Sequence, residues 1–174
     1  IVATEARLQT VNRQLREEAA ARKVPRIGST VVVLLACEGY CAYLWAGDSR
    51  IYLCRQGRLT LLSRDHNLLE EMRSKGAAPA DRHARRAAQS RITRAVGVRD
   101  ELRLDGDVVE VEDGDVFLLC SDGLTNELSE REIMDALLPG NCGQASEALV
   151  DAALKAGGRD NVSAVVVRAE DLDA

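Results

Sequence analysis

Aromatic residues are scarce in this chain: they make up 3% of its 174 residues, with one Trp, one Phe and three Tyr. Hydrophobic residues nevertheless amount to 46%, so we expect a core built mainly from Val, Leu, Ile and Ala. No apolar run is long enough to cross a bilayer, and the residues from Ile1 onward do not resemble a signal peptide. These absences favour a single soluble, cytoplasmic domain without a membrane span.

An excess of positive charge is also absent, because the formal net charge is −5. Domains that bind nucleic acid usually carry a basic surface, so this balance argues against nucleic acid as a partner. The chain has five cysteines, an odd number with no Cys-x-x-Cys pair, which does not suit a disulfide framework. We expect all of them to be reduced: Cys37, Cys41, Cys54, Cys120 and Cys142.

The hydrophobic pattern predicts helices mixed with antiparallel strands rather than repeated βαβ units. Expected helices cover residues 3–22, 67–76, 129–138 and 144–156. Expected strands cover residues 30–36, 40–46, 51–55, 58–62, 102–111, 116–120 and 162–167. We expect residues 30–62 to form one antiparallel meander. The fold class is therefore α+β, in a layered sandwich of antiparallel sheet and helices.

The most informative stretch is residues 116–124, where five consecutive apolar residues are followed by Ser121, Asp122 and Gly123. An unbroken apolar run predicts a strand buried on both faces. A carboxylate at the mouth of such a strand is costly unless a cation or hydrogen-bond donors compensate it. The alternative is a plain turn, because two other Asp-Gly pairs, at Asp105 and Asp113, lie where ordinary turns are expected.

Two further aspartates share this setting, since Asp48 and Asp160 each lie where an expected strand meets a Gly-containing turn. The chain has only two histidines and no His-x-x-x-His spacing, so the carboxylates suit a hard cation with oxygen ligands. A pair of such ions can lower the pKa of bound water and hold a phosphoryl group. The spacing alone is also compatible with three unrelated turns.

Residues 64–99 carry nine basic side chains against four acidic ones, although the chain as a whole is acidic. A local basic surface of this kind can attract a phosphorylated partner. From composition alone, a solvated and mobile loop is the favoured alternative.

Five short motifs occur in a fixed order along the chain: residues 28–30, 47–50, 92–97, 121–124 and 158–161. Together they resemble the metal-dependent Ser/Thr protein phosphatases of the PPM (protein phosphatase 2C-like) family, in its bacterial branch. The resemblance extends from the first helix to the last strand. It implies a sandwich of two antiparallel β-sheets flanked by helices. It also implies hydrolysis of phosphoserine and phosphothreonine by metal-bound water, with Mn²⁺ or Mg²⁺.

The resemblance assigns roles to particular residues. Asp122 and Asp160 become ligands of a binuclear centre with two tightly bound ions, and Asp48 holds a third, weaker ion together with Asp122. Residues 64–95 correspond to the flap of the family, a variable insert beside the active site. Within it, Arg82, Arg85 and Arg86 are expected to bind substrate. The implied partners are phosphorylated proteins, including a cognate Ser/Thr kinase and its targets.

The family also has catalytic residues that precede the first helix, and nothing in this sequence matches them. They are a glutamate, an Asp-Gly pair that bridges both metals, a phosphate-binding arginine and a histidine. We therefore expect residues 1–174 to be one catalytic domain that is incomplete at its N-terminus, so that activity needs residues upstream of Ile1. The alternative is a non-catalytic module that binds phosphoproteins or a kinase, but retention of all three aspartates favours the enzyme. His66, at an expected helix start, is interpreted as structural.

Overall fold

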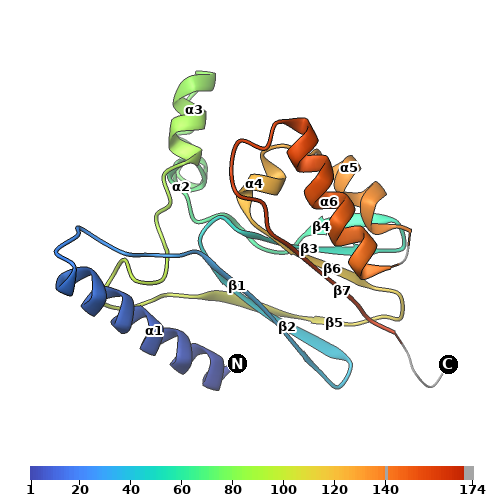
Figure 1. Cartoon of the computed structure of the whole chain (residues 1–174), viewed down its shortest axis with the longest axis horizontal. Coiled ribbons are helices and arrows are strands. Elements are labelled where there is room, and N and C mark those ends of the chain that lie inside the picture. Colours follow the sequence, from blue (N-terminus) through green and yellow to red (C-terminus); the bar gives the residue numbers. More distant parts are fainter. Residues whose placement is uncertain (140, 171–174) are drawn as a thin grey trace. The chain divides into compact units, whose positions relative to one another are not determined.

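The computed structural model describes residues 1–139 and 141–170, which form six helices and seven strands (Figure 1). The helices are α1 (Val2–Ala21), α2 (Leu68–Ser74), α3 (Arg82–Gln89), α4 (Asp122–Thr125), α5 (Glu130–Leu137) and α6 (Cys142–Ala156). The strands are β1 (Val31–Cys37), β2 (Tyr40–Ala46), β3 (Arg50–Arg55), β4 (Arg58–Leu61), β5 (Asp105–Glu110), β6 (Val116–Cys120) and β7 (Ala164–Arg168).

The strands form two sheets, one with the order β1-β2-β5 and the other with the order β4-β3-β6-β7. The expected α+β class, with two antiparallel sheets and accompanying helices, is confirmed. The expected single meander over residues 30–62 is wrong, because the hairpins β1-β2 and β3-β4 belong to different sheets. The reason is that both edges of β3 are already paired, with β4 on one side and β6 on the other.

By its internal contacts the chain divides into two compact units. Unit 1 contains residues 1–35, 42–48 and 64–107. Unit 2 contains residues 36–41, 49–63 and the described residues from Val108 onward. The interpretation of residues 1–174 as one catalytic domain, with residues 64–95 as a flap-like insert, stays a prediction.

Unit 2 is built around the predicted buried strand. Every residue of β6 is buried except Leu119, which is partly buried. Helix α6 packs against β7 and brings Ala145, Leu149 and Ala153 to the core at spacings of four residues, which lie on one helix face. This packing fixes the ends of β6 and β7, where two of the candidate aspartates lie.

Unit 1 is held together partly by a polar side chain of α1. Asn12 is buried, and its amide nitrogen donates to the carbonyl oxygens of Arg99 (3.0 Å) and Asp100 (3.2 Å). Its Oδ1 accepts a hydrogen bond from the main-chain N–H of Gly97 at 2.6 Å. Because the hydrogen-bonding groups of this buried amide have partners, it fixes the loop before β5 without the cost of an unsatisfied polar group.

Two helices were not expected from the sequence. Helix α3 lies in the stretch for which a mobile loop was favoured, and Asp81 caps it by accepting a hydrogen bond from the N–H of Ala84 at 2.8 Å. The available signal was an N-cap residue followed by residues with high helix propensity, but the apolar residues of this helix are only alanines, so its period is weak. Helix α4 is a single turn that follows β6 directly.

All five cysteines are free, as expected. Cys41, Cys54 and Cys120 are buried, where a thiol acts as a small apolar group, whereas Cys37 is exposed. Among the described residues, no helix has both the length and the apolar character needed to span a membrane.

Candidate functional site

Asp122 and Asp160 are brought together at one end of the sheet in unit 2, because the turns that carry them follow β6 and precede the adjacent strand β7. Three hydrogen bonds join these turns. The N–H of Ser121 donates to the carbonyl of Ser163 at 3.1 Å, and the N–H of Ser163 donates to Ser121 Oγ at 3.0 Å. The hydroxyl of Ser121 donates to the carbonyl of Asn161 at 3.2 Å.

Gly123 allows the two acidic turns to lie so close. A Cβ atom at this position would collide with the main-chain carbonyl of Asn161 and would lie 3.5 Å from the Cβ of Asp160. A glycine lets the backbone approach another group closely, and here that group is the Asp160-Asn161 backbone.

The side chains of this pair suit a hard divalent cation. Asp122 is partly buried and accepts a hydrogen bond from the amide of Asn126 at 3.3 Å, while Asp160 is exposed and accepts one from the N–H of Asn161 at 2.7 Å. In the part of the chain that the structure describes, neither carboxylate forms an ion pair with a basic side chain. Adjacent carboxylates repel each other unless a cation lies between them.

The chemistry of these donors fits Mg²⁺ or Mn²⁺, since such ions take oxygen ligands and are commonly held by one or two carboxylates together with water. Within residues 108–139 and 141–170, no group of three or more Asp, Glu, His or Cys side chains has the arrangement of a metal site. In the described part of unit 2, the candidate ligands are therefore two neighbouring carboxylates, Asp122 and Asp160. Their role as metal ligands stays a prediction.

Asp48 lies in unit 1, directly after β2, and is 9% exposed. The preceding Gly47 has a φ of 122°, and a Cβ atom there would collide with the side chain of Thr30. The backbone on which Asp48 sits is therefore tightly constrained. Because Asp48 and Asp122 belong to different units, the third metal position that would involve both of them stays a prediction.

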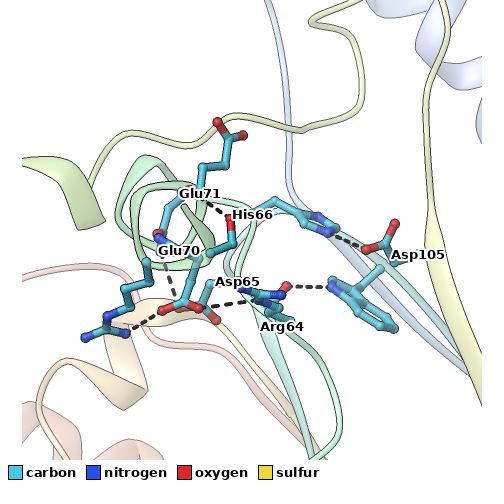
Figure 2. Close-up of polar contacts among 10 residues, drawn as sticks. Arg64, Asp65, His66, Glu70, Glu71 and Asp105 are labelled. Carbon is cyan, nitrogen blue, oxygen red and sulfur yellow. Dashed lines mark hydrogen bonds and ion pairs between the residues drawn. The ribbon is translucent and has the colours of Figure 1, made fainter. Parts of the chain in front are cut away.

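His66 is hydrogen-bonded to this turn, and its imidazole faces Asp105 (Figure 2). Its main-chain N–H donates to the carbonyl of Gly47 at 2.8 Å, and the N–H of Gly47 donates to His66 Nδ1 at 3.2 Å. A main-chain N–H can only donate, so Nδ1 must accept and the proton of the neutral ring lies on Nε2. His66 Nε2 lies 3.0 Å from Asp105 Oδ2 and donates to it. The indole ring of Trp45 stacks on the imidazole.

Burial and hydrogen bonding set the charges of His66 and Asp105. Burial lowers the pKa of His66 below its ordinary value, an effect that outweighs the hydrogen bond to Asp105. Burial raises the pKa of Asp105, but hydrogen bonds from His66 and Arg94 outweigh this effect, so that the pKa is lowered. A neutral imidazole therefore lies beside an ionised carboxylate at neutral pH.

Asp105 was expected to be an ordinary turn residue, and this expectation is wrong. It opens β5, and its carboxylate contacts both His66 and Arg94. Asp-Gly is a common turn signal, so the local sequence hid a role that depends on His66, 39 positions away. At Asp113, by contrast, the expected turn is present, and Gly114 has a φ of 79°.

The predicted flap is anchored at its base in unit 1. An isolated bridge joins Asn67 and Ile92, and the N–H of Leu68 donates to the carbonyl of Arg91 at 2.9 Å. The N–H of Thr93 donates to the carbonyl of His66, also at 2.9 Å. His66 therefore contacts both the base of the flap and the turn that carries Asp48.

The three flap arginines lie on α3. Arg82, Arg85 and Arg86 are exposed, and their spacing of three and four residues places them on one helix face. Arg85 Nε donates to the carbonyl of Pro79 at 2.6 Å. The sequence predicted these residues as a set, and the structure places them together, but their contact with substrate stays a prediction.

Comparisons with known proteins identify close relatives. The family model described as "Protein phosphatase 2C" matches residues 1–156. Protein phosphatase PhpP of Streptococcus pneumoniae is 32% identical over 170 residues, which cover 96% of this chain and 68% of that protein.

Solved structures show the same similarity. PppA, described as a key regulatory component of T6SS in Pseudomonas aeruginosa, is 39% identical with a TM-score of 0.84, covering 92% of this chain and 66% of that one. The catalytic domain of the serine threonine protein phosphatase PstP, in complex with two manganese ions, is 29% identical with a TM-score of 0.81. That match covers 98% of this chain and 70% of PstP's. The chain thus spans about two thirds of the length of these relatives.

Proposed function

Because this chain belongs to the protein phosphatase 2C family, a family of enzymes, we propose that it acts in the hydrolysis of phosphoserine and phosphothreonine on proteins. The observation that carries the proposal is the juxtaposition of Asp122 and Asp160, made close by Gly123. Two carboxylates without a basic partner need a cation, and a relative with the same fold binds two manganese ions.

Asp122 and Asp160 are the residues that would hold Mn²⁺ or Mg²⁺ in unit 2. When bound, two such ions lower the pKa of coordinated water and neutralise charge on a phosphoryl group. The protein's contribution is to hold the two carboxylates at fixed positions, which the hydrogen bonds of Ser121 to Asn161 and Ser163 achieve. Asp48 would bind a third, weaker ion together with Asp122.

The substrate side of the proposal rests on α3. Arg82, Arg85 and Arg86 place three positive charges on one exposed face, which suits the approach of a phosphorylated protein. A cognate Ser/Thr kinase and its targets are the phosphoproteins that we expect as partners.

The decisive test replaces single carboxylates by amides of the same shape in the full-length protein. Asp122→Asn and Asp160→Asn should each reduce Mn²⁺-dependent hydrolysis of a phosphothreonine peptide by about a hundredfold or more, because each removes the charge that holds the cation. Both variants should unfold at a temperature close to that of the wild type. Asp151→Asn, at an exposed position of α6, is the matched control and should keep full activity.

Full Mn²⁺-dependent activity of either active-site variant would contradict the assignment of these ligands. Binding of the phosphopeptide without hydrolysis by the wild-type protein would instead favour a non-catalytic phosphatase-like module. Calorimetric titration with Mn²⁺ gives an independent reading, since the two variants should lose metal binding whether or not turnover is measured.

A further inference from the structure

We propose that His66 is a positioning residue for the turn that carries Asp48, and that it acts through Nδ1, the ring nitrogen that faces Gly47. The inference rests on the proposed function, in which Asp48 is a metal ligand. It concerns a residue at the base of the flap that has no contact with substrate in the proposed mechanism. His66 would therefore influence the metal site through the backbone and not through chemistry of its own.

The connection between His66 and the turn is reciprocal. Each residue donates a hydrogen bond to the other, from the His66 N–H to the Gly47 carbonyl at 2.8 Å and from the Gly47 N–H to His66 Nδ1 at 3.2 Å. His66 is 8% exposed and Gly47 is buried, so water does not compete effectively for these groups. Hydrogen bonds shielded in this way are stronger, and an unmatched donor costs more.

The imidazole ring is held in one orientation by contacts from other segments. Asp105, at the start of β5, accepts a hydrogen bond from His66 Nε2, as Figure 2 shows. Trp45, in β2, stacks on one face of the ring with a centroid separation of 6.0 Å and an interplanar angle of 10°. Asp105 is itself fixed by an ion pair with Arg94. With Nε2 and the ring plane fixed in this way, Nδ1 has one direction available, and it points to the Gly47 N–H.

The turn itself has little freedom to compensate. Gly47 adopts a φ of 122°, which favours glycine, and its Cα lies against the side chain of Thr30. Asp48 follows directly, so a rotation of the Gly47-Asp48 peptide would redirect the carboxylate. Loss of the Nδ1 acceptor would leave a buried N–H without a partner and would favour such a rotation.

A purely structural histidine would behave differently, because its replacement would act through stability alone. Two substitutions can test the acceptor Nδ1 and the donor Nε2 separately. In His66→Asn, the side-chain oxygen can take the place of Nδ1 and accept from Gly47, but the donor to Asp105 is lost. In His66→Gln, the side-chain amide can take the place of Nε2 and donate to Asp105, but no acceptor faces Gly47.

The experiment measures the Mn²⁺ concentration needed for half-maximal hydrolysis of a phosphothreonine peptide by the full-length wild type and both variants. We expect His66→Gln to require about tenfold more Mn²⁺, the size of effect seen when groups that orient metal ligands are removed. His66→Asn should stay within about threefold of the wild type. Thermal unfolding of each variant shows whether the shift follows stability.

Two results would overturn the inference. One is an unchanged Mn²⁺ requirement in His66→Gln, and the other is an equal shift in both variants that follows their loss of thermal stability. Calorimetric titration with Mn²⁺ compares the Mn²⁺ affinity of the wild type and both variants without relying on hydrolysis. A wild-type protein that binds Mn²⁺ but does not hydrolyse the peptide would therefore contradict the proposed function, while the binding data still decide the role of His66.

Discussion

The backbone of Gly123 lies directly against the main-chain carbonyl of Asn161, with no space for a side chain between them. Gly123 follows one candidate metal ligand and Asn161 follows the other. Their contact therefore sets how closely Asp122 and Asp160 approach each other. Hydrogen bonds through Ser121 hold the same two turns together, but only the absence of a Cβ atom permits the contact.

Gly123→Ala should therefore separate the two carboxylates. The added methyl group collides with backbone and not with a flexible side chain, so we expect a loss of about 1–3 kcal/mol in the free energy of unfolding. Mn²⁺ affinity and phosphatase activity should fall by about tenfold or more. Gly143→Ala is the control, because the added Cβ atom would lie closest to Oδ1 of Asn141, which belongs to an exposed side chain. Equal effects of the two substitutions on Mn²⁺ affinity would contradict this account.

In unit 2, an ion pair between a buried carboxylate and a partly exposed guanidinium should make a large contribution to stability. Asp115 is 1% exposed and accepts two hydrogen bonds from Arg55, at 2.8 and 2.6 Å. Asp115→Ala removes the two hydrogen bonds of Arg55 and the acceptor of the Glu112 N–H, so we expect the free energy of unfolding to fall by about 2–3 kcal/mol. Glu112→Ala removes a half-exposed partner of the same guanidinium and should cost at most about 1 kcal/mol. Urea unfolding followed by circular dichroism measures both, and similar losses would contradict the assignment.

Acid should destabilise unit 1 through His66. Burial lowers the pKa of His66 below its ordinary value of 6.5, supported by Arg94 and opposed by Asp105 and Asp65. The unfolded chain therefore binds the proton more readily than the folded one. The free energy of unfolding should fall as the pH drops below about 6.5. Above that pH, His66 does not make the free energy of unfolding depend on pH. Fluorescence of Trp45, the single tryptophan and the ring that stacks on His66, can follow urea unfolding across this range.

His66→Asn is the control for the pH experiment, because asparagine does not titrate there. The wild type should lose stability between about pH 6.5 and pH 5 more steeply than this variant. Parallel pH profiles would show that other groups cause the acid sensitivity.

The arginines of α3 should affect protein substrates more than small ones. Replacing Arg82, Arg85 and Arg86 with alanine should lower kcat/KM for a phosphoprotein by about tenfold at low ionic strength, because exposed charges steer an anionic partner. Hydrolysis of p-nitrophenyl phosphate should change little. The control removes the same charge from three exposed arginines outside the flap: Arg7, Arg13 and Arg131. A similar loss on both substrates would assign the α3 arginines to the chemistry instead of to steering.

Local signals in the sequence predicted most of the elements. Asn67 caps α2 and Ser129 forms a capping box with Glu132, at the starts of the helices expected over residues 67–76 and 129–138. The assignment of the two hairpins to different sheets was not predictable, because strand pairing is decided by the partner β6, far along the chain. Helix α3 was missed because its apolar face consists of alanines alone (Ala84, Ala87 and Ala88), which give a weak apolar signal.

The candidate site could also be predicted only in part. Each acidic turn was recognisable from its position at a strand end, and the pairing of β6 with β7 brings Asp122 and Asp160 together. The network of Asp105 and His66 was not recognised, because each residue had an ordinary local explanation. The property that connects them is the burial of His66, since a buried imidazole needs partners for both nitrogens.

The pairing of β6 with β7 also sets when the acidic pair can form during protein synthesis. Ser121 and Asn161, which join the two turns, are 40 positions apart. At translation rates of about 5–20 residues per second, the turn of Asp122 emerges about 2–8 seconds before its partner. During that time the edge of β6 that will bind β7 stays open, and an open strand edge can pair with other chains. The acidic pair is therefore completed only after residue 161 has emerged, and until then the open edge of β6 needs protection from aggregation.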